Sequence, residues 1–401
     1  MVGFYPSIML ITLIADDLTG ACDAGAPFAG RDRVGVFLSP AAPGSEWTVA
    51  AVDTESRGLA PPEAAEVVRG ATARLGTRLA RGLLFKKIDS TLRGPVGAEL
   101  EALLTASGRR TALLCPAFPG QRRTVAHGVL LVDGAPAHES PIAQDPAYPG
   151  PTSDVAEIVR RGAARPVSVL SLARVRGGHD ELARALGDAR DRIVAADAET
   201  DEDLGALAGA ALGCPGLVLA GAAGLARAVA ERLGHAGPPV PLPEGHAWLI
   251  VAGSLHPSTR AQLGALEAAG VTGLRLADLQ DPDLRPLVEE IKTGHPVFIT
   301  TGEGVAGAPS ARQAAASRLA LVAARVLAES RPDLVAVTGG ETAVALLRAV
   351  GATRVELSGA PSSGLALGEA VVDAGSTFPL LTKAGGFGPP DLFLALLKGT
   401  P

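Results

Sequence analysis

The sequence contains little cysteine: three residues in 401, Cys22, Cys115 and Cys214, which lie far apart. Their spacing fits no structural metal site, and an odd, scattered set is typical of reduced thiols in a cytosolic protein. His127 and His138 have no third ligand at a useful spacing, so we expect no protein-built metal site.

Positive charge is also limited. The 36 Lys and Arg residues are outnumbered by 42 Asp and Glu residues, and the net charge is −6. Binding to the phosphate backbone of nucleic acid needs a basic surface, so we do not expect nucleic acid as the main partner.

Long apolar runs are missing from the N-terminus. Residues 8–15 are apolar, but no basic segment precedes them, and Asp16 and Asp17 follow at once. The run is too short for a membrane span and lacks the form of a signal peptide. We therefore expect a soluble, cytoplasmic protein that does not act on membranes.

Short apolar runs alternate with longer Ala-, Leu- and Arg-rich stretches of helical periodicity. This order predicts a parallel or mixed α/β sheet, in which ligands bind where the carboxyl ends of strands turn into helices. Apolar residues make up 47% of the chain, enough for sizeable cores, and a length of 401 residues favours two domains. The expected strands are residues 8–15, 34–38, 48–53, 82–89, 111–117, 216–221, 247–253, 295–301 and 333–339, and clear helices are expected at 61–76 and 311–330.

The domain boundary is predicted at residues 236–245, where four prolines indicate a linker. The two domains are then residues 1–235 and 246–401. Each is expected to be an α/β domain with a mostly parallel or mixed sheet flanked by helices, with a ligand cleft between the two. A second proline-rich stretch, residues 141–151, is interpreted as an ordered excursion within the first domain.

The stretch KKIDSTLRG, residues 86–94, concentrates charged and hydroxyl side chains at the end of a predicted strand. In such a strand Lys87 and Asp89 share a face while Lys86 points the other way. Arg93 can hold a carboxylate with two parallel hydrogen bonds, and Asp89 and Ser90 suit hydroxyl groups. The combination is what a small polyhydroxy acid requires, and the predicted substrate-binding residues of this stretch are Lys86, Lys87, Asp89, Ser90 and Arg93. A salt-bridged surface loop is the alternative.

Two other strand ends carry similar chemistry. Asp16 and Asp17 follow the first strand; one can cap the next helix while the other faces the crevice, and the sequence leaves open which does which. The stretch VDTESRG places Asp53, Ser56 and Arg57 after the third strand, where a solvated loop is equally compatible with the sequence.

The second domain has three glycine-containing turns at strand ends. Glycine lets a backbone approach phosphate oxygens, and helix N-termini offer amide donors to an anion, so the set favours nucleotide binding. None of the three turns has the GxxxxGKS/T or GxGxxG spacing, so they do not support a P-loop or a dinucleotide fold. Glu341 either caps its helix electrostatically or contacts ribose or a metal ion. The predicted nucleotide-binding residues are Gly253, Ser254, Ser258, Thr338, Gly339, Gly340, Glu341, Thr342, Lys383, Gly385 and Gly386.

Together, these motifs resemble the four-carbon acid-sugar kinase family, formerly a domain of unknown function. The resemblance covers nearly the whole chain. It rests on IADDLTGACDAG, DTESR, KKIDSTLRG, the FPGQRRT…G…DG…P…ES…DP run, GAAGLA, GSLHPSTRAQL, TGGETA and TKAGGFGPPDLF.

The resemblance implies an ATP-dependent kinase of acids such as threonate, erythronate or 3-oxo-tetronate. The first domain would bind the acid and the second ATP, and a homodimer is implied. Mg²⁺ would bridge the ATP phosphates. Arg57, Lys87 and Arg93 would bind the carboxylate, Asp89 would orient hydroxyls, and Asp16 or Asp17 would be the base. Lys383 and the Gly385–Gly386 turn would face the phosphates.

Two departures from the family pattern concern loops. Arg123 takes the position of the family's arginine in Gly-Arg-Thr and is expected in the substrate pocket, whereas Arg122 is extra and could alter that pocket. At residues 360–364 a Pro-Gly turn is replaced by Pro-Ser-Ser-Gly, on the nucleotide side.

Two rival functions remain at this point. A non-catalytic sugar-acid sensor would bind the same acids without producing ADP. A dehydrogenase or aldolase acting on these acids is a further possibility, but the glycine turns do not have a dehydrogenase's spacing.

Overall fold

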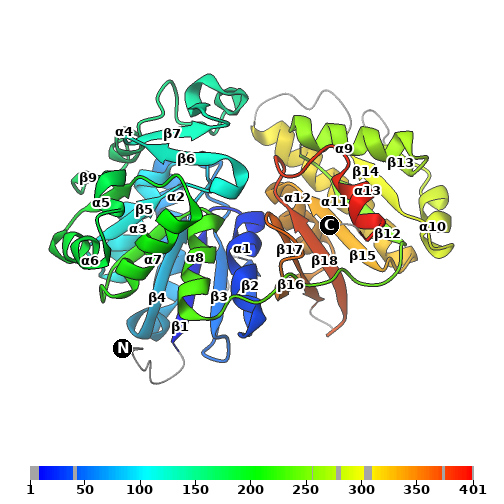
Figure 1. The fold of residues 1–401 in the computed structure, drawn as a ribbon. Helices are drawn as coiled ribbons and strands as arrows, with labels where there is room; N and C mark the ends of the chain where they lie inside the picture. Colours follow the sequence, from blue (N-terminus) through cyan, green and yellow to red (C-terminus); the bar gives the residue numbers. More distant parts are fainter. Residues whose placement is uncertain are drawn as a thin grey trace. The chain divides into compact units, whose positions relative to one another are not determined.

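The computed structural model describes residues 9–38, 43–254, 256–276, 281–301, 309–372 and 375–399. The chain forms two compact units, Met1–Gly237 and Pro238–Pro401. The boundary between them in the sequence falls inside the stretch predicted as a linker. In Figure 1 the first unit runs from blue to green and the second from green to red. Each unit is described by itself, and the ligand cleft expected between them stays a prediction. Residue 8 of the first expected strand and Leu255 of the GSLHPSTRAQL motif lie outside the described residues.

The main sheet of the first unit is entirely parallel, with strand order β2-β3-β1-β4-β11-β5-β10-β9. Its strands are near-continuous apolar runs because helices cover both faces. The strands are β1 (Leu10–Ala15), β2 (Val34–Leu38), β3 (Val49–Asp53), β4 (Gly82–Lys87), β5 (Ala112–Cys115), β9 (Val167–Leu170), β10 (Ile193–Ala196) and β11 (Val218–Gly221).

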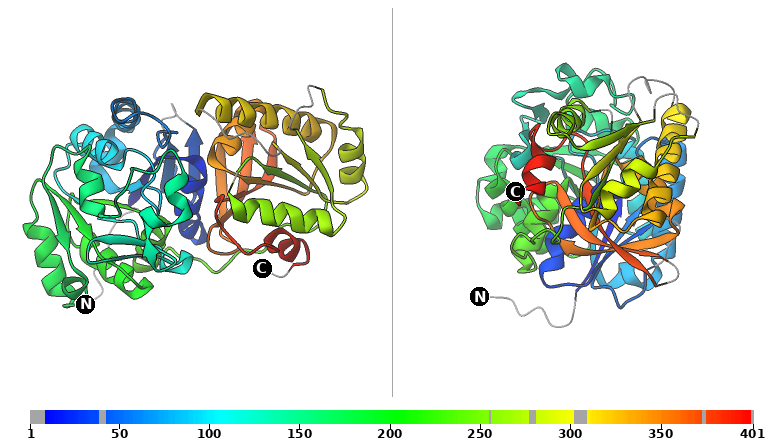
Figure 2. Two further views of the ribbon diagram at one scale, coloured as in Figure 1. Left: turned by 90° about the horizontal axis from the view of Figure 1, so that it is seen from above. Right: turned by 90° about the vertical axis from the view of Figure 1, so that its right-hand side faces the viewer.

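Helices pack on both sides of this sheet, as the two views in Figure 2 show. The helices are α1 (Leu18–Gly25), α2 (Pro61–Arg74), α3 (Val96–Ser107), α4 (Val155–Arg160), α5 (Leu172–Val175), α6 (His179–Asp188), α7 (Asp201–Leu212) and α8 (Ala223–Leu233). Helix α3 contacts α2 and α4, whereas α1 and α7 pack against α8.

A small antiparallel sheet, β6-β7-β8, extends from the first unit between β5 and α4. Its strands are β6 (Arg123–Ala126), β7 (Val129–Val132) and β8 (Ala135–Pro136). The proline-rich stretch 141–151 follows it and begins with a 3₁₀ turn, η5 (Pro141–Gln144). The stretch is ordered and belongs to the first unit, as interpreted from the sequence.

The second unit has a mixed sheet, ordered β13-β14-β12-β15-β18-β17-β16. Among the described strands of this sheet, β17 alone runs against the others, since it pairs antiparallel with both β16 and β18. The strands are β12 (Trp248–Ala252), β13 (Thr272–Arg275), β14 (Val297–Thr300), β15 (Leu334–Thr338), β16 (Ala352–Gly359), β17 (Leu365–Val372) and β18 (Thr377–Lys383).

Helices again lie on both faces of this sheet (Figure 2). Helix α11 contacts α10 and α12, and α9 contacts α13. The helices are α9 (Pro257–Ala268), α10 (Arg285–Lys292), α11 (Pro309–Glu329), α12 (Gly340–Ala349) and α13 (Leu392–Leu397). Trp248, Phe298 and Phe393 are fully buried in the core between these elements. The α/β fold class predicted from the sequence is confirmed.

Candidate active site

Three neighbouring strands of the first unit end in one row. Ala15 of β1 lies beside Asp53 of β3 on one side and Lys87 of β4 on the other. The segments that follow therefore meet at one edge: Asp16–Asp17, 54–57 and 88–93. The helix after β1 leads toward β2 and β3, whereas the chain after β4 leads toward β5, so this edge is a switch point of the kind where α/β proteins bind ligands.

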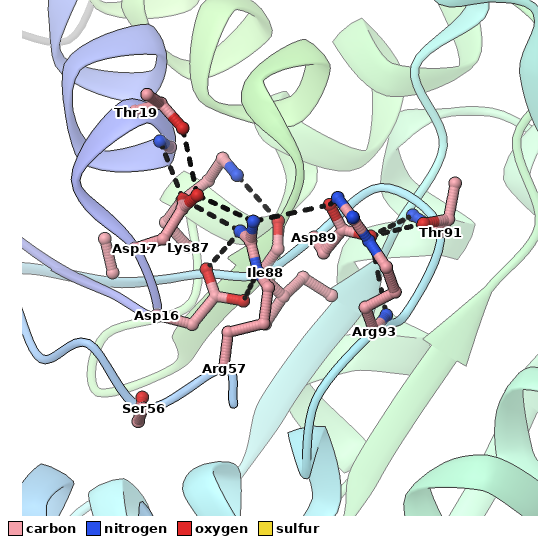
Figure 3. Close-up of polar contacts among 12 residues, drawn as sticks. Asp16, Asp17, Thr19, Ser56, Arg57, Lys87, Ile88, Asp89, Thr91 and Arg93 are labelled. Carbon is pink, nitrogen blue, oxygen red and sulfur yellow. Dashed lines mark hydrogen bonds and ion pairs between the residues drawn. The ribbon is translucent and has the colours of Figure 1, made fainter. Parts of the chain in front are cut away.

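Arg57 is the centre of this cluster (Figure 3). Its Nε and Nη2 donate to the two carboxylate oxygens of Asp16, each at 2.9 Å. Its Nη1 and Nη2 also donate to Asp17, at 2.6 and 2.8 Å. Asp89 lies 3.9 Å from Nη1 on the other side. The arginine predicted to bind substrate thus holds the two predicted catalytic aspartates in place.

Asp17 has a second role as the N-cap of α1, because its Oδ1 accepts from the Gly20 amide at 2.8 Å and its Oδ2 from the Thr19 hydroxyl at 2.9 Å. Gly20 leaves room for two side chains here: a Cβ would lie 2.5 Å from Asp17 Oδ1 and 2.9 Å from Lys87 Nζ, so both side-chain ends would have to shift. The start of α1 therefore brings a carboxylate and an ammonium group together. Lys87 itself is buried and donates to the Ile88 carbonyl at 2.7 Å.

The loop after β4 folds back on itself. Arg93 donates from Nε and Nη2 to the two oxygens of Asp89, at 2.9 and 2.8 Å. Thr91 donates to Asp89 through both its amide and its hydroxyl. Leu92 has a φ of 59°, the left-handed region that a bulky residue rarely adopts. This turn lies between Asp89 and Arg93, which pair with each other, and Ser90 lies half-buried in the same loop.

The proline-rich stretch is attached to this loop. Arg93 Nη1 donates to Asp145 Oδ2 at 2.9 Å, and the Gly94 amide donates to the Ala147 carbonyl at 2.8 Å. Asp145 is a site residue that the sequence reasoning did not single out. Its signal was present in the DP pair inside the proline-rich stretch.

The charges of this cluster are strongly stabilised. Burial alone would raise the pKa of Asp16, but the charge and hydrogen bonds of Arg57 outweigh it and lower that pKa. Burial and Arg93 oppose each other in the same way at Asp89, and the net pKa is well below the usual value. Asp53 differs: it is fully buried, its Oδ2 has no hydrogen-bond partner, and burial raises its pKa well above the usual value.

Lys86 is not among the exposed groups of the cluster. Its Nζ lies 3.0 Å from Glu99 Oε2 on α3, and both side chains are buried, at 0% and 1% exposure. It also donates to the Lys87 carbonyl at 3.1 Å. Its predicted role as a substrate ligand stays a prediction; in this structure its charge is paired with Glu99 behind the strand end.

Arg122 and Arg123 point in different directions. Arg122 is exposed and pairs with Asp133 at 2.7 Å, so the extra arginine lies on the surface rather than in a pocket. Arg123 is half-buried, and the charges of Asp89 and Arg93 act on it. It therefore lies near the loop after β4.

The second unit brings its three predicted turns together at one edge. In β12, β15 and β18 the residues Ala252, Thr338 and Lys383 are in register. The Gly253 amide donates to the Thr338 carbonyl at 3.2 Å. A Cβ on Gly385 would lie 2.3 Å from Ser254 Oγ, so the glycine lets the β18 turn approach the β12 turn without moving the Ser254 side chain.

The turn after β18 is held by three side chains behind it. Lys383 Nζ donates to the carbonyls of Ala384, Gly385 and Phe387 at 2.9–3.1 Å. Thr259 donates to the Gly385 carbonyl at 2.7 Å, and Gln262 Nε2 donates to the Phe387 carbonyl and to two further ones, of Gly388 and Pro389. Burial lowers the pKa of Lys383 to about 7. Lys383 thus shapes the turn; sequence reasoning missed its two helpers, which lie on α9.

The remaining predicted residues surround this edge. Gly339 and Gly340 begin α12, Glu341 lies exposed in its first turn, and Thr342 is buried beneath it. Ser258 donates its amide to His256, the N-cap of α9. At residues 360–364 the altered turn keeps Gly364, whose Cα faces Phe387 of the β18 turn.

Three further observations concern metal ligands, a cavity and membrane-spanning helices. Among the described residues no group of three or more His, Cys, Asp or Glu side chains could hold a metal ion. A cavity of about 690 Å³ opens at the opposite end of the first sheet, beside Gly82 and Leu217, and none of the predicted site residues lines it. No helix in the described part of the chain has the length and apolar character needed to cross a membrane.

Comparison with known proteins gives matches along the whole chain. Residues 11–229 match a family described as a sugar-binding N-terminal domain, and residues 249–393 match a nucleotide-binding C-terminal domain. The chain is 36% identical to a D-threonate kinase of Bordetella bronchiseptica, covering 96% of each chain. It is 32% identical to a D-erythronate kinase of Heliobacterium modesticaldum, over 95% of this chain and 94% of that one.

A solved structure has the same fold. The crystal structure of a Haemophilus influenzae protein superposes with a TM-score of 0.73 at 20% identity, covering 98% of this chain and all of the other.

Proposed function

Because the chain belongs to the four-carbon acid-sugar kinase family, we propose that it uses ATP to phosphorylate a hydroxyl group of a small sugar acid. The acid would have about four carbons, as in threonate, erythronate or a 3-oxo-tetronate. The observation that carries the proposal is the row of strand ends in the first unit, where cations, carboxylates and hydroxyls meet at one switch point.

The acid would bind at this row. Phosphoryl transfer needs a positioned hydroxyl and a group that can accept its proton. Asp17 is the better candidate for that base, since its side chain is 14% exposed, against 1% for Asp16. Asp16 would hold Arg57, and Asp89 would orient hydroxyl groups of the substrate.

ATP would bind at the glycine turns of the second unit. Thr338 Oγ1 is buried without a hydrogen-bond partner at the end of β15, and the close approach at Gly385 leaves backbone rather than side chain at the edge. Both features fit phosphate recognition by backbone amides and hydroxyls. Mg²⁺ would be held mainly by the phosphate oxygens, with the exposed Glu341 carboxylate as an available oxygen ligand. Lys383 would support the phosphate-binding turn from behind.

An ADP-release assay with a panel of four-carbon acids tests the proposal. We expect ADP production that depends on an acid. D17N should lower kcat by roughly 10²- to 10⁴-fold while ATP binding is unchanged, because a missing base affects the chemical step. D188N, at an exposed position on α6, is the matched control and should behave like the wild type.

A sugar-acid sensor is the competing function. Binding of acids without any ADP production would favour it and would end the kinase proposal. Two further expectations are tested separately: a homodimer by light scattering, and a cytoplasmic location, for which the three free thiols Cys22, Cys115 and Cys214 are suitable, by fractionation of cells.

A further inference from the structure

Helix α9 lies against the turn that follows β18. Two of its residues, Thr259 and Gln262, donate to carbonyl oxygens within residues 385–389. His256, the N-cap of α9, stands about one helical turn before Thr259. A Cβ on Gly386 would lie 3.0 Å from His256 Nε2 and 3.3 Å from each of the two neighbouring ring carbons. The imidazole therefore approaches the turn with its Nε2 end.

The capping hydrogen bond fixes which ring nitrogen of His256 carries a proton. Its Nδ1 accepts from the Ser258 amide at 3.2 Å. An accepting Nδ1 carries no proton, so the proton of this ring is on Nε2. The His256 amide donates to Ser254 Oγ at 3.3 Å, which ties the residue to the turn after β12. The ring thus presents an N–H donor at the glycine turn of β18.

The peptide groups of the same turn add backbone donors. Lys383 Nζ holds the carbonyls of Ala384 and Gly385, and Thr259 also donates to the second of them. In a trans peptide the N–H points opposite to the C=O, so the amides of Gly385 and Gly386 point away from these two side chains. Both glycines are partly exposed. Amide and imidazole donors therefore lie together at an open edge of the second unit.

A second observation at this edge also points to a ligand. Thr338 is 0% exposed and ends β15 in register with Lys383, and its Oγ1 finds no hydrogen-bond partner in the described part of the chain. Such buried, unpartnered polar atoms are rare in folded proteins. The next residue, Gly339, packs on the β12 turn, since a Cβ there would lie 3.3 Å from the Ser254 nitrogen. A hydroxyl, an imidazole N–H and backbone amides together suit a ligand with several acceptor oxygens, which a phosphate provides.

We infer that His256 binds the nucleotide by donating a hydrogen bond from Nε2 to a phosphate oxygen. The inference rests on the proposed function for its ligand, and it adds a side-chain donor to the backbone amides and hydroxyls at this edge. His256 would thereby favour a phosphorylated nucleotide over the bare nucleoside, because adenosine has no phosphate oxygen to accept the bond. Thr259 and Gln262 remain supports of the turn, since they bond to its carbonyls.

The test compares H256N with H246N, which changes an exposed histidine just before β12. Asparagine is a good N-cap, so H256N keeps an acceptor for the Ser258 amide, but its shorter side chain cannot place a donor where Nε2 lies. Calorimetric titration with ADP should give a Kd roughly 10- to 100-fold higher for H256N than for the wild type, because a hydrogen bond to a charged group is lost. The Kd for adenosine should change less than about twofold. H246N should match the wild type with both ligands.

Nitrogen NMR of the wild type adds a readout that a merely structural role would not change. The Nε2–H signal of His256, assigned by its loss in H256N, should shift when ADP is added and stay in place with adenosine. If H256N does not fold, the loss of the signal in H256Q gives the assignment, and the wild-type spectra still test the inference.

The outcomes separate this inference from the kinase proposal. A Kd for ADP in H256N within about twofold of the wild type, equal losses for ADP and adenosine, or an Nε2–H signal unchanged by ADP would overturn the inference, even if the wild type makes ADP. If ADP binds through His256 but no acid causes ADP release from ATP, the inference stands and the kinase proposal falls. A wild type that binds neither ADP nor ATP would overturn both.

Discussion

The buried pair of Lys86 and Glu99 allows a sharp test of how the row of strand ends is supported. Both side chains are at least 99% buried, and Glu99 already has one oxygen, Oε1, without a hydrogen-bond partner. In K86M the carboxylate of Glu99 would be left in the interior with no counter-charge. Removing one partner of a buried ion pair typically costs about 3–5 kcal/mol of stability.

The expected change in melting temperature follows from the size of the first unit. For units of 150–250 residues, 1 kcal/mol corresponds to about 2–4 °C, so K86M should lower the melting temperature of this unit by roughly 6–20 °C. The double variant K86M/E99L removes both charges and replaces them with apolar groups. It should recover most of the loss, because the desolvation cost of the pair disappears with it.

Scanning calorimetry of the full chain measures these values. The control is R110M, which breaks the exposed pair of Arg110 with Asp191 and should change stability by less than about 1 kcal/mol. A K86M variant that melts within 2 °C of the wild type would refute the reasoning. A K86M/E99L variant that is less stable than K86M would also refute it.

Two further predictions concern the edges of the two sheets. G20A should lower kcat/KM for the acid by at least about tenfold, because the new Cβ displaces the side-chain ends of Asp17 and Lys87. Stability should fall little, since alanine favours the helix. Steady-state kinetics and a melting curve test this, and unchanged kinetics would contradict it. Burial lowers the pKa of Lys383 from 10.5 to about 7 in the folded protein. Between about pH 7 and pH 10.5 this lysine is therefore protonated in the unfolded chain but largely neutral in the folded one. Stability should therefore rise with pH from about 7 toward 10.5 in the wild type and not in K383M, as urea titrations at pH 6.5–9.5 would show; parallel pH profiles for the two proteins would be the contrary result.

The sequence predicted nine of the parallel strands, which are continuous apolar runs followed by glycine or acidic turns. It did not predict β10 and β13, which are also parallel. The strand expected at 82–89 is β4, Gly82–Lys87, and the one at 333–339 is β15. The antiparallel strands β16 and β17 were not predicted. Charged residues interrupt both, Arg354 and Glu356 in one and Glu369 in the other, and their partners become clear only in the sheet. The short β9 at the sheet edge was missed for a similar reason, since most of it is partly exposed.

The sequence predicted which segments form the site, but not which side chains pair with one another there. Parallel strand ends meet at one edge, so the convergence of Asp16, Arg57 and Asp89 follows from the order of motifs. Which carboxylate each cation contacts depends on side-chain direction and on residues far along the chain. Lys86 pairs with Glu99 and Arg93 with Asp145, and no spacing in the sequence reveals either pair.

The turn after β18 has a consequence for how this protein tolerates change. Its carbonyl oxygens are fastened by Lys383, Thr259 and Gln262, so the loop's conformation is dictated by residues that need never meet a nucleotide. A substitution of Gln262, which lies on α9, should therefore impair nucleotide binding as much as a substitution in the loop itself. Harmful substitutions should then be found at the residues that hold this loop as well as at its glycines.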